Sequence, residues 1–213
     1  MSADDVELAA LELARRGGLQ RLTLRAVALS LGVQSPSLYH HIPGGLDELQ
    51  ARVVDRVIAE FEAEVQQQAL PAESGWQRLE RSLRAVGRLS REYPGVLQYV
   101  MSTGRDRVPA LASAEQTVLQ LLDSELGPKT AEAWLLVHTY VTGWVFAQRP
   151  SSAAATSHGF SQLGAVLAEA EHLDHEKVLF EGLRALLAGL LVSSSEPEDP
   201  PTTVSRTLRK FLR

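Results

Sequence analysis

The amino-acid sequence predicts an all-α protein, and three observations lead to this fold class. Apolar residues recur at three- and four-residue spacing along the chain, and no stretch keeps the alternating apolar and polar pattern of a strand. Glycine and proline interrupt the pattern at intervals typical of helix lengths. With 213 residues, 45% of them hydrophobic and 22% charged, the chain also has the composition of a folded globular protein with a sizeable core.

The N-terminal region, residues 1–45, predicts three short helices, because each break in the pattern has a chemical cause. The glycine pair at 17–18 ends the first helix, and Thr23 is expected to cap the second. Gly32 breaks the second helix, and Ser35 with Pro36 opens the third, with Ser35 as its cap. The expected helices are Ala3–Arg16, Thr23–Leu31 and Ser35–His41.

Longer amphipathic segments follow. Leu46–Gln67 carries an apolar stripe and is expected to connect the N-terminal region to a larger helical body. Residues 194–205 are rich in Ser, Glu and Pro, so the C-terminal end is expected to be a flexible tail. The predicted domains are 1–45, 46–193 and 194–213, and the helices expected within the body after the connector are Ser74–Glu92, Pro94–Ser102, Val108–Leu126, Pro128–Gln148, His158–Ala170 and His175–Ser193.

The charge of the chain limits where it could contact a nucleic acid. The formal net charge is −5, so the whole molecule has no general attraction to polyanions and any such contact must be local. The window from Leu13 to Leu46 contains no acidic residue. Its basic residues are Arg15, Arg16, Arg21 and Arg25.

Several classes of protein are excluded or disfavoured. The absence of cysteine excludes disulfides, zinc-thiolate sites and cysteine nucleophiles. Acidic residues precede any basic residue at the N-terminus, which is not the order of a signal peptide. The longest nearly apolar run, Trp134–Ala147, is shorter than the roughly 20 residues that a membrane helix needs. We therefore expect a cytoplasmic protein with no membrane partner.

Enzymatic and metal-site motifs are also missing. The sequence contains no G-x-S-x-G, no P-loop and no G-x-G-x-x-G, so we expect no enzyme and no cofactor. Glu169 and His172 have the Glu-x-x-His spacing of di-iron helical bundles. Such a site needs this motif on two helices, and only one copy is present. A solvated helix end therefore accounts better for this segment than a metal site.

The segment Leu24–Ile42 has the spacing of a helix-turn-helix motif. The first helix needs a small residue where the two helices cross, and Ala28 supplies it. Four residues later the chain must turn sharply, which Gly32 allows. An ordinary helical hairpin is the alternative. The apolar residues expected to form the small core that fixes the angle between the helices are Val27, Leu31, Val33 and Leu38.

Polar residues at the second helix of this motif are candidates for DNA contact. Short polar groups at a helix start can reach base edges in the major groove, whereas a tyrosine hydroxyl and an imidazole suit phosphate oxygens. We expect Ser35, Pro36 and Ser37 to face bases. The other candidate DNA-binding residues are Gln34 and His40 on the exposed face, and Thr23, Tyr39 and His41 at phosphates, with Arg25 positioned to help.

The stretch LTLRAVALSLGVQSPSLYHHIPGGLDEL resembles the DNA-binding head of the tetracycline-repressor (TetR) family, in which a Leu-Tyr-x-His pattern closes the recognition helix. Here that pattern is Leu38–His41, and the resemblance spans about Val6–Val54. Two departures are present. Gly45 stands where the family usually has a lysine that contacts phosphate, and Leu24 stands where a polar residue is common.

The last predicted helix resembles the family's final helix, which packs in the dimer interface. In Leu179–Leu190, leucines supply apolar area, and small residues on one face would let another helix approach closely. Packing within the chain alone is the alternative. The small residues are Gly182, Ala185 and Gly189.

The resemblance implies an N-terminal three-helix helix-turn-helix head and a C-terminal helical ligand-binding and dimerisation domain. Aromatic and apolar residues of the body could line a ligand pocket or could equally be core. The candidate pocket residues are Tyr99, Trp134, His138, Val141 and Trp144.

The function that the resemblance implies is transcription regulation. A homodimer would bind a palindromic operator in double-stranded DNA, and a small-molecule effector would release it, as for a repressor. The alternative is a helical small-molecule-binding protein with a degenerate DNA-binding head, which only the missing lysine at Gly45 supports. A di-metal helical enzyme is the third possibility.

Overall fold

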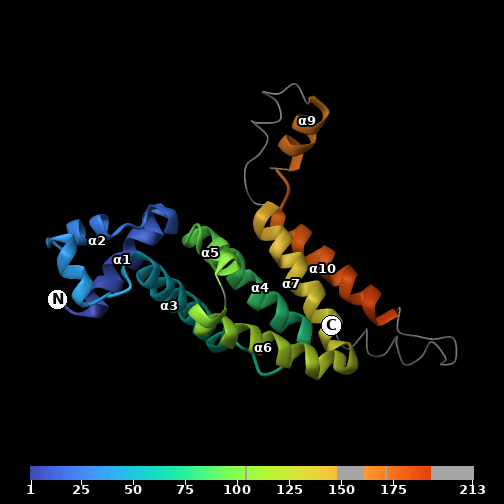
Figure 1. Ribbon diagram of the computed structural model, residues 1–213. Coiled ribbons are helices and arrows are strands. Elements are labelled where there is room, and N and C mark those ends of the chain that lie inside the picture. Colours follow the sequence, from blue (N-terminus) through green and yellow to red (C-terminus); the bar gives the residue numbers. More distant parts are fainter. Residues whose placement is uncertain (104, 148–160, 171, 193–213) are drawn as a thin grey trace. The chain divides into compact units, whose positions relative to one another are not determined.

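The computed structural model describes residues 1–103, 105–147, 161–170 and 172–192, and all of the regular secondary structure in these ranges is helical (Figure 1). The predicted all-α class is thereby confirmed. Two compact units are present, and each is described by itself. The first comprises Met1–Glu73 with Gln77–Leu121, and the second comprises Ser74–Trp76 with the residues from Leu122 onward. The predicted tail, 194–213, lies outside the described residues.

The first unit contains the N-terminal helices and the larger parts of α4 and α6. Its helices are α1 (Ala3–Gly17), the 3-10 helix η1 (Leu19–Arg21), α2 (Leu24–Ser30), the 3-10 helix η2 (Ser35–His40), α3 (Gly45–Gln67), α4 (Gly75–Glu92), α5 (Val96–Ser102), the 3-10 helix η3 (Arg105–Arg107) and α6 (Pro109–Leu126).

Local chemistry sets the beginnings of the first helices. Ser2 caps α1 in a capping box: its hydroxyl accepts a hydrogen bond from the Asp5 N–H at 3.1 Å, and the Asp5 carboxylate accepts one from the Ser2 N–H at 2.6 Å. Thr23 caps α2 as predicted, because its Oγ1 accepts a hydrogen bond from the Ala26 N–H at 3.1 Å. Between the two helices the sequence did not predict η1, whose Leu19 N–H donates to the Pro94 carbonyl at 2.7 Å.

One hydrophobic core runs through the head and the helices that follow it. Val6 and Ala10 of α1 pack in the same cluster as Val53 and Val57 of α3, and all four side chains are fully buried. Fully burying a leucine or valine contributes about 1.5–3 kcal/mol. The core therefore fixes the head to α3. The domain boundary predicted at residues 45–46 stays a prediction.

Ion pairs reinforce the contact between α1 and α3. The Arg56 guanidinium donates from Nη1 to Asp4 at 2.9 Å and to Glu7 at 3.3 Å, both on α1. It also donates from Nε to Glu60 at 3.1 Å on its own helix. These hydrogen bonds, that to Asp4 first, raise the pKa of Arg56 above its ordinary value. Arg56 thus ties the middle of α3 to the first two turns of α1.

Polar contacts also join α3 to α4 and α6. The Asp55 carboxylate accepts a hydrogen bond from the Ala110 N–H, at the start of α6, at 2.7 Å. Arg88 of α4 pairs with Glu64 at 2.7 Å, and its guanidinium lies 5.7 Å from the centre of the Phe61 ring. The helix α3 therefore contacts α1, α4 and α6.

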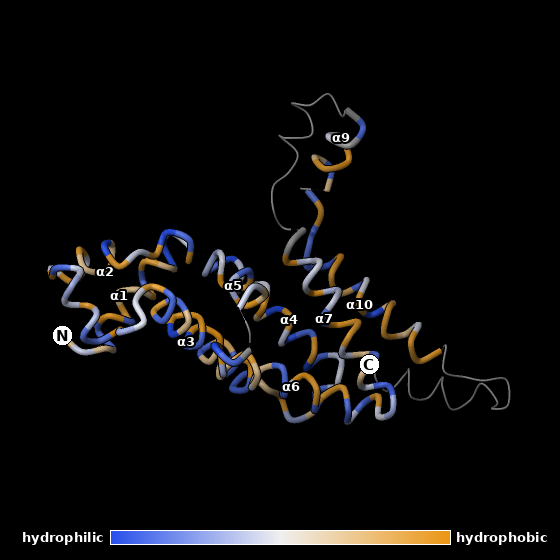
Figure 2. Tube along the Cα trace, in the orientation of Figure 1, coloured by the Kyte–Doolittle hydropathy of each residue, from blue (hydrophilic) through white to orange (hydrophobic). Residues whose placement is uncertain are grey.

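The second unit is built around α7 (Thr130–Ala147) and α10 (His175–Val192), which lie side by side, with the 3-10 helix η4 (Gly127–Lys129) before α7. Hydrogen bonds join them: Trp144 Nε1 donates to the His175 carbonyl at 3.1 Å, and Tyr140 Oη donates to the Val178 carbonyl at 3.4 Å. The unit also contains α9 (Ser161–Ala170). Figure 2 shows apolar residues along most of α10.

The helix α10 divides its apolar residues between two environments. Leu179, Leu183, Leu187 and Leu191 are buried within the chain. A Cβ added at Gly182 would overlap the Tyr140 hydroxyl of α7, so the Tyr140 side chain would have to move to accommodate it. Gly189, by contrast, has open space around its Cα. No described helix is long and apolar enough to cross a membrane.

Candidate nucleic-acid interface

The helix-turn-helix core is packed largely as its spacing predicts. Ala28 is buried at the helix crossing, and the Val33 N–H donates to its carbonyl at 2.9 Å, which closes the turn. Gly32, within this turn, has a φ of +66°. Val27 and Leu38 are buried, whereas Leu31 and Val33 are half-buried against the same core. The angle between the two helical segments is therefore fixed by packing.

The recognition segment differs from the prediction in its geometry. Residues Ser35–His40 form a 3-10 helix, in which the Ser37 N–H donates to the Gln34 carbonyl at 3.0 Å. The prediction that Ser35 caps this helix is wrong: Gln34 holds the cap position, with no side-chain hydrogen bond, and Ser35 is the first helical residue. Pro36 follows at the second position, where a missing N–H leaves no helical hydrogen bond unmade.

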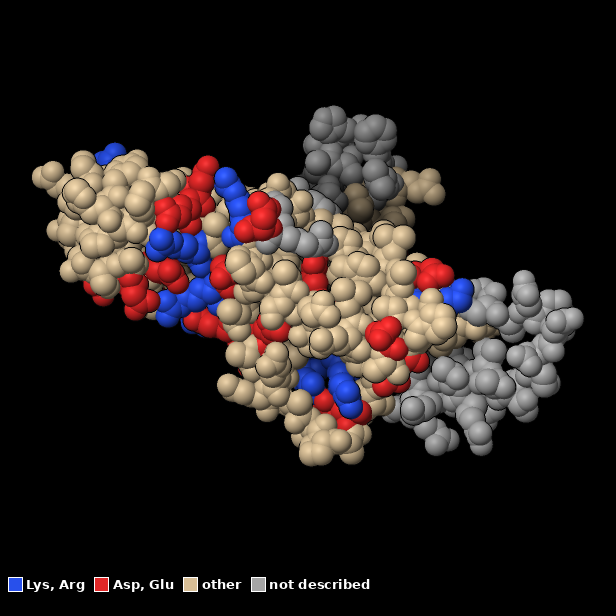
Figure 3. All heavy atoms as spheres, turned by 60° about the horizontal axis from the view of Figure 1, so that its bottom comes forward, with Lys and Arg blue, Asp and Glu red and all other residues tan. Residues whose placement is uncertain are grey.

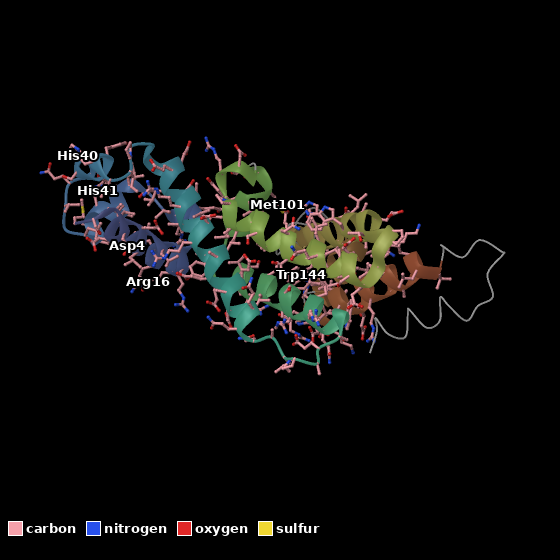
Figure 4. The ribbon with its side chains drawn as sticks, turned by 90° about the horizontal axis from the view of Figure 1, so that it is seen from below. Asp4, Arg16, His40, His41, Met101 and Trp144 are labelled. Carbon is pink, nitrogen blue, oxygen red and sulfur yellow. The ribbon has the colours of Figure 1, made fainter. Side chains whose placement is uncertain are left out.

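The predicted DNA-binding side chains of this segment are accessible. Gln34, Pro36, Tyr39 and His40 are exposed, and Ser35, Ser37 and His41 are half-buried. Across the described part of the chain, none of the polar side chains in this set forms a hydrogen bond with another residue. Figure 4 shows His40 and His41 in the head, with His40 at its outer edge. Their donors and acceptors are free for an external partner.

Thr23 and Arg25 flank the recognition segment in the same head. Both side chains are exposed. Since Thr23 Oγ1 already accepts the Ala26 N–H, its hydroxyl hydrogen remains able to donate to a phosphate oxygen. Arg25 forms no ion pair with any described acidic residue, and neither does Arg21.

The head is less positive than the acid-free window suggested. Arg16 pairs with Glu12, one turn earlier on α1, at 2.6 Å, and Arg15 pairs with Glu92 of α4 at 3.5 Å. On the face shown in Figure 3, acidic and basic side chains are interleaved and no wholly basic surface gathers. Half of the predicted positive charge is therefore compensated by acids that lie outside the window.

The structure also places the candidate ligand-pocket residues. Tyr99 lies on α5 in the first unit, and its buried hydroxyl has no hydrogen-bond partner among the described residues. The other four lie on α7 in the second unit. Trp134 lies against the exposed His138, with ring centroids 5.3 Å apart and ring planes tilted by 40°. Val141 is half-buried, and Trp144 is buried and borders a groove.

That groove lies between α7 and α10 and has a volume of about 440 Å³. Thr139, Tyr140 and Gly143 form part of its α7 wall, and Val178 and Leu186 part of its α10 wall. It is an open depression with mostly apolar walls, and several large apolar side chains of the same unit are exposed. These are Leu135, Val166, Leu173, Val178, Leu186 and Val192.

A second hollow was not predicted from the sequence. It lies inside the first unit, between α3, α4 and α6, and has a volume of about 110 Å³. Its walls are apolar except for a few polar side chains, among them Glu62 and Thr117. The apolar wall residues are Ile58, Phe61, Val65, Ala85, Val86, Leu89, Ala114 and Val118. No local sequence signal marks them, because they are drawn from three helices. Within the described residues, no three His, Asp or Glu side chains gather as metal ligands.

Comparisons with known proteins agree with this geometry. Residues 8–44 match the family model described as bacterial regulatory proteins, tetR family. The chain is 26% identical over 200 residues to the HTH-type transcriptional repressor DrrR1 of Streptomyces coeruleorubidus, covering 93% of this chain and 72% of that protein.

Solved structures show the same fold. A possible TetR family transcriptional regulator from Streptomyces coelicolor A3(2) superposes with a TM-score of 0.66 at 18% identity, covering 90% of this chain and 100% of that one. The TetR family protein ActR of Streptomyces coelicolor, in complex with (S)-DNPA, superposes with a TM-score of 0.61 at 22% identity, covering 91% of this chain and 98% of that one.

The helix-turn-helix head and the helical body together define a transcriptional regulator. The match of the head to the family model, with the repressor relative and the shared fold, confirms the resemblance drawn from the sequence. The head of this chain thus matches the TetR family model, and the chain has the fold of TetR family regulators.

Proposed function

We propose that this chain is a homodimeric repressor that binds a palindromic operator and is released from it by a small molecule. The observation that carries the proposal is the recognition segment, residues 34–41. Its polar side chains are accessible and form no hydrogen bonds within the described structure, while its apolar side chains are packed into the core. Such polar groups can form hydrogen bonds with DNA, and they form none that stabilise the described fold.

Base contacts and phosphate contacts are assigned to different residues. Ser35, Pro36 and Ser37 stand at the start of the recognition segment and are placed to face base edges in the major groove. Their short side chains allow the backbone to approach the groove closely. The residues assigned to phosphates are Thr23, Tyr39 and His41, with Arg25 beside them and Gln34 and His40 at the exposed edge.

The dimer is assigned to the groove between α7 and α10. Val178, Leu186 and Val192 are 49%, 40% and 54% exposed, and they share the helix that resembles the dimer helix of the family. A second copy of the chain would cover this apolar surface, and the open space at Gly189 allows a close approach. Two heads on a twofold axis would then meet half-sites about one helical turn, or a multiple of it, apart.

The effector site is assigned to the cavity between α3, α4 and α6. Its α3 wall lies on the helix that Arg56 ties to α1 of the head. An effector that binds one arrangement of α3 more tightly than another favours the arrangement of the head that goes with it. The equilibrium between the two arrangements shifts by the ratio of the two affinities. The ActR structure, which has this fold, contains (S)-DNPA, and a TetR variant from Acinetobacter baumannii of the same fold was solved with minocycline.

Selection of bound sequences from a random DNA library, at two salt concentrations, tests the DNA-binding function. An enriched palindrome supports a dimeric regulator. No enrichment at either concentration contradicts it and favours a small-molecule-binding protein with a degenerate head. On the selected operator, Ser37→Ala should reduce discrimination against mismatched bases, and Tyr39→Phe should weaken operator and random DNA alike. Ser30→Ala is the control, because the Ser30 hydroxyl already donates to the Val27 carbonyl at 2.8 Å.

A further inference from the structure

The cavity between α3, α4 and α6 contains one feature that its apolar walls do not explain. Glu62, which is half-buried, lines it, and a cation beside such a partly desolvated carboxylate stabilises its charge. The other two glutamates in this part of α3 do have arginine partners: Glu60 pairs with Arg56, and Glu64 with Arg88. Glu62 forms no ion pair with any cationic side chain of the described chain.

The hydrogen bonds to Glu62 come from neutral groups and all reach the same oxygen. Thr117 Oγ1 donates to Glu62 Oε1 at 3.0 Å, and Ser113 Oγ and Gln66 Nε2 donate to it at 3.3 Å. These donors hold the carboxylate in place between α3 and α6 without neutralising it. The second oxygen, Oε2, accepts no hydrogen bond from a described residue.

A nearby arginine does not supply the missing charge. Arg88 stacks on Phe61, another residue of the cavity wall, but its Nη1 is hydrogen-bonded to Glu64 at 2.7 Å. The hydrogen bond from Arg88 is the chief cause that lowers the pKa of Glu64, so the charges of Arg88 and Glu64 compensate each other. Arg88 therefore compensates Glu64 and not Glu62, and the carboxylate of Glu62 can accept a cationic group of a ligand.

The size of the cavity limits the apolar part of that ligand. Its volume of about 110 Å³ is close to that of an apolar cavity of roughly 150 Å³ that accepts a benzene ring. The walls from α4 and α6 consist of valine, alanine and leucine side chains. Ser82 and Thr117 are the polar residues that these two helices contribute to the cavity. An occupant of about one ring would satisfy the apolar walls.

We propose that the effector is a compact apolar molecule with a cationic amino group, and that this group binds the free carboxylate oxygen of Glu62. This inference rests on the proposed function, because it assumes that the cavity is the effector site. The ammonium group would compensate the charge of Glu62, and the apolar part would fill the space between Phe61, Val86 and Val118. A neutral or anionic molecule of the same shape would leave Glu62 uncompensated.

The test uses the full chain and three probes of similar shape and different charge: benzylamine, toluene and benzoate. Their dissociation constants are measured by titrating the methyl NMR signals of the valines that line the cavity. Benzylamine should bind about 10- to 100-fold more tightly than toluene, the range of a hydrogen bond to a charged group, and benzoate should bind worst. Glu62→Gln should abolish the preference for benzylamine over toluene.

The matched control is Glu60→Gln, which removes a carboxylate from the same helix outside the cavity and should keep the preference. Equal affinities of benzylamine and toluene for the wild-type chain would overturn the inference even if Glu62→Gln failed to fold. So would a preference that survives in a folded Glu62→Gln variant. If none of the probes binds, the cavity is not the effector site, and this part of the proposed function fails as well. If toluene or benzoate binds best, only the charge assignment fails.

Discussion

Replacing Gly45 by lysine would restore the cation that TetR-family heads usually carry after the recognition helix, and the structure predicts its cost. Gly45 has a φ of +66°, where a residue with a side chain costs about 1–2 kcal/mol. A Cβ there would lie 3.4 Å from Tyr39 Cε1, an ordinary contact that adds no clash. In a chain of this size each kcal/mol lowers Tm by about 2–4 °C. Gly45→Lys should therefore unfold about 2–8 °C below the wild type.

The charge of the new lysine should appear only in DNA binding. Each phosphate contact steepens the dependence of log affinity on log salt by about 0.9. Gly45→Ala is the matched control, because it carries the same backbone cost without the cation. We expect the two variants to have similar Tm values in a thermal melt, and only Gly45→Lys to show the steeper salt dependence in a fluorescence anisotropy titration with random DNA.

Two results would refute this reasoning. If Gly45→Ala unfolds at the wild-type temperature, the left-handed conformation at this position is not required. If Gly45→Lys and Gly45→Ala have the same salt dependence, position 45 does not face a phosphate, and the missing lysine has no bearing on how tightly this chain binds DNA.

Further predictions concern the cap of α2 and the Glu73–Arg81 ion pair. Thr23→Ala should lose about 1 kcal/mol of stability, because it removes the cap. Thr23→Asp should keep the cap and bind DNA more weakly, because the carboxylate repels phosphate. Equal DNA affinity of the wild type and Thr23→Asp would contradict the phosphate contact. Arg81→Met should lower the free energy of unfolding, measured in urea, by about 2 kcal/mol, because the Glu73 and Arg81 side chains are only 11% and 17% exposed. Arg84→Met, which removes an exposed ion pair, is the control and should lower it by under about 0.5 kcal/mol. Since Arg81 lowers the pKa of Glu73, this stabilisation is present above about pH 4.3 and is lost as the pH falls through the folded-state pKa; unfolding curves of Arg81→Met should depend less on pH in that range, and an unchanged dependence would count against the pair.

The helices could be predicted from the sequence because their limits depend on local chemistry. The Thr23 cap and the glycines at 17–18 act over one turn, and the observed helix ends lie within a few residues of those expected. The fold class follows from periodicity, composition and the glycine and proline breaks, and the helix-turn-helix follows from the spacing of its small and apolar residues. The conformation of the recognition segment could not be predicted, because its six residues are too few for periodicity to distinguish a 3-10 helix from an α-helix.

Features that depend on contacts between distant residues were not predictable. The arginine window looked positive because it begins one residue after Glu12, the partner of Arg16, and because Glu92 lies 77 residues from Arg15. The contact of Gly182 on α10 with Tyr140 on α7 has no signal in the local sequence either. The cavity escaped prediction for the same reason, since its walls come from α3, α4 and α6 and carry no shared motif.

The several roles of α3 restrict how effector specificity could be changed, by evolution or by design. This helix carries Glu62 of the cavity and, six residues earlier, Arg56 of the contact with the head, so substitutions on it risk altering recognition and response together. The walls from α4 and α6 contribute Val86 and Val118, which do not belong to the core shared with the head, whereas Ala114 packs against that core. A biosensor library that varies residues 86 and 118 and leaves α3 intact should therefore yield new ligand preferences with the operator preference unchanged.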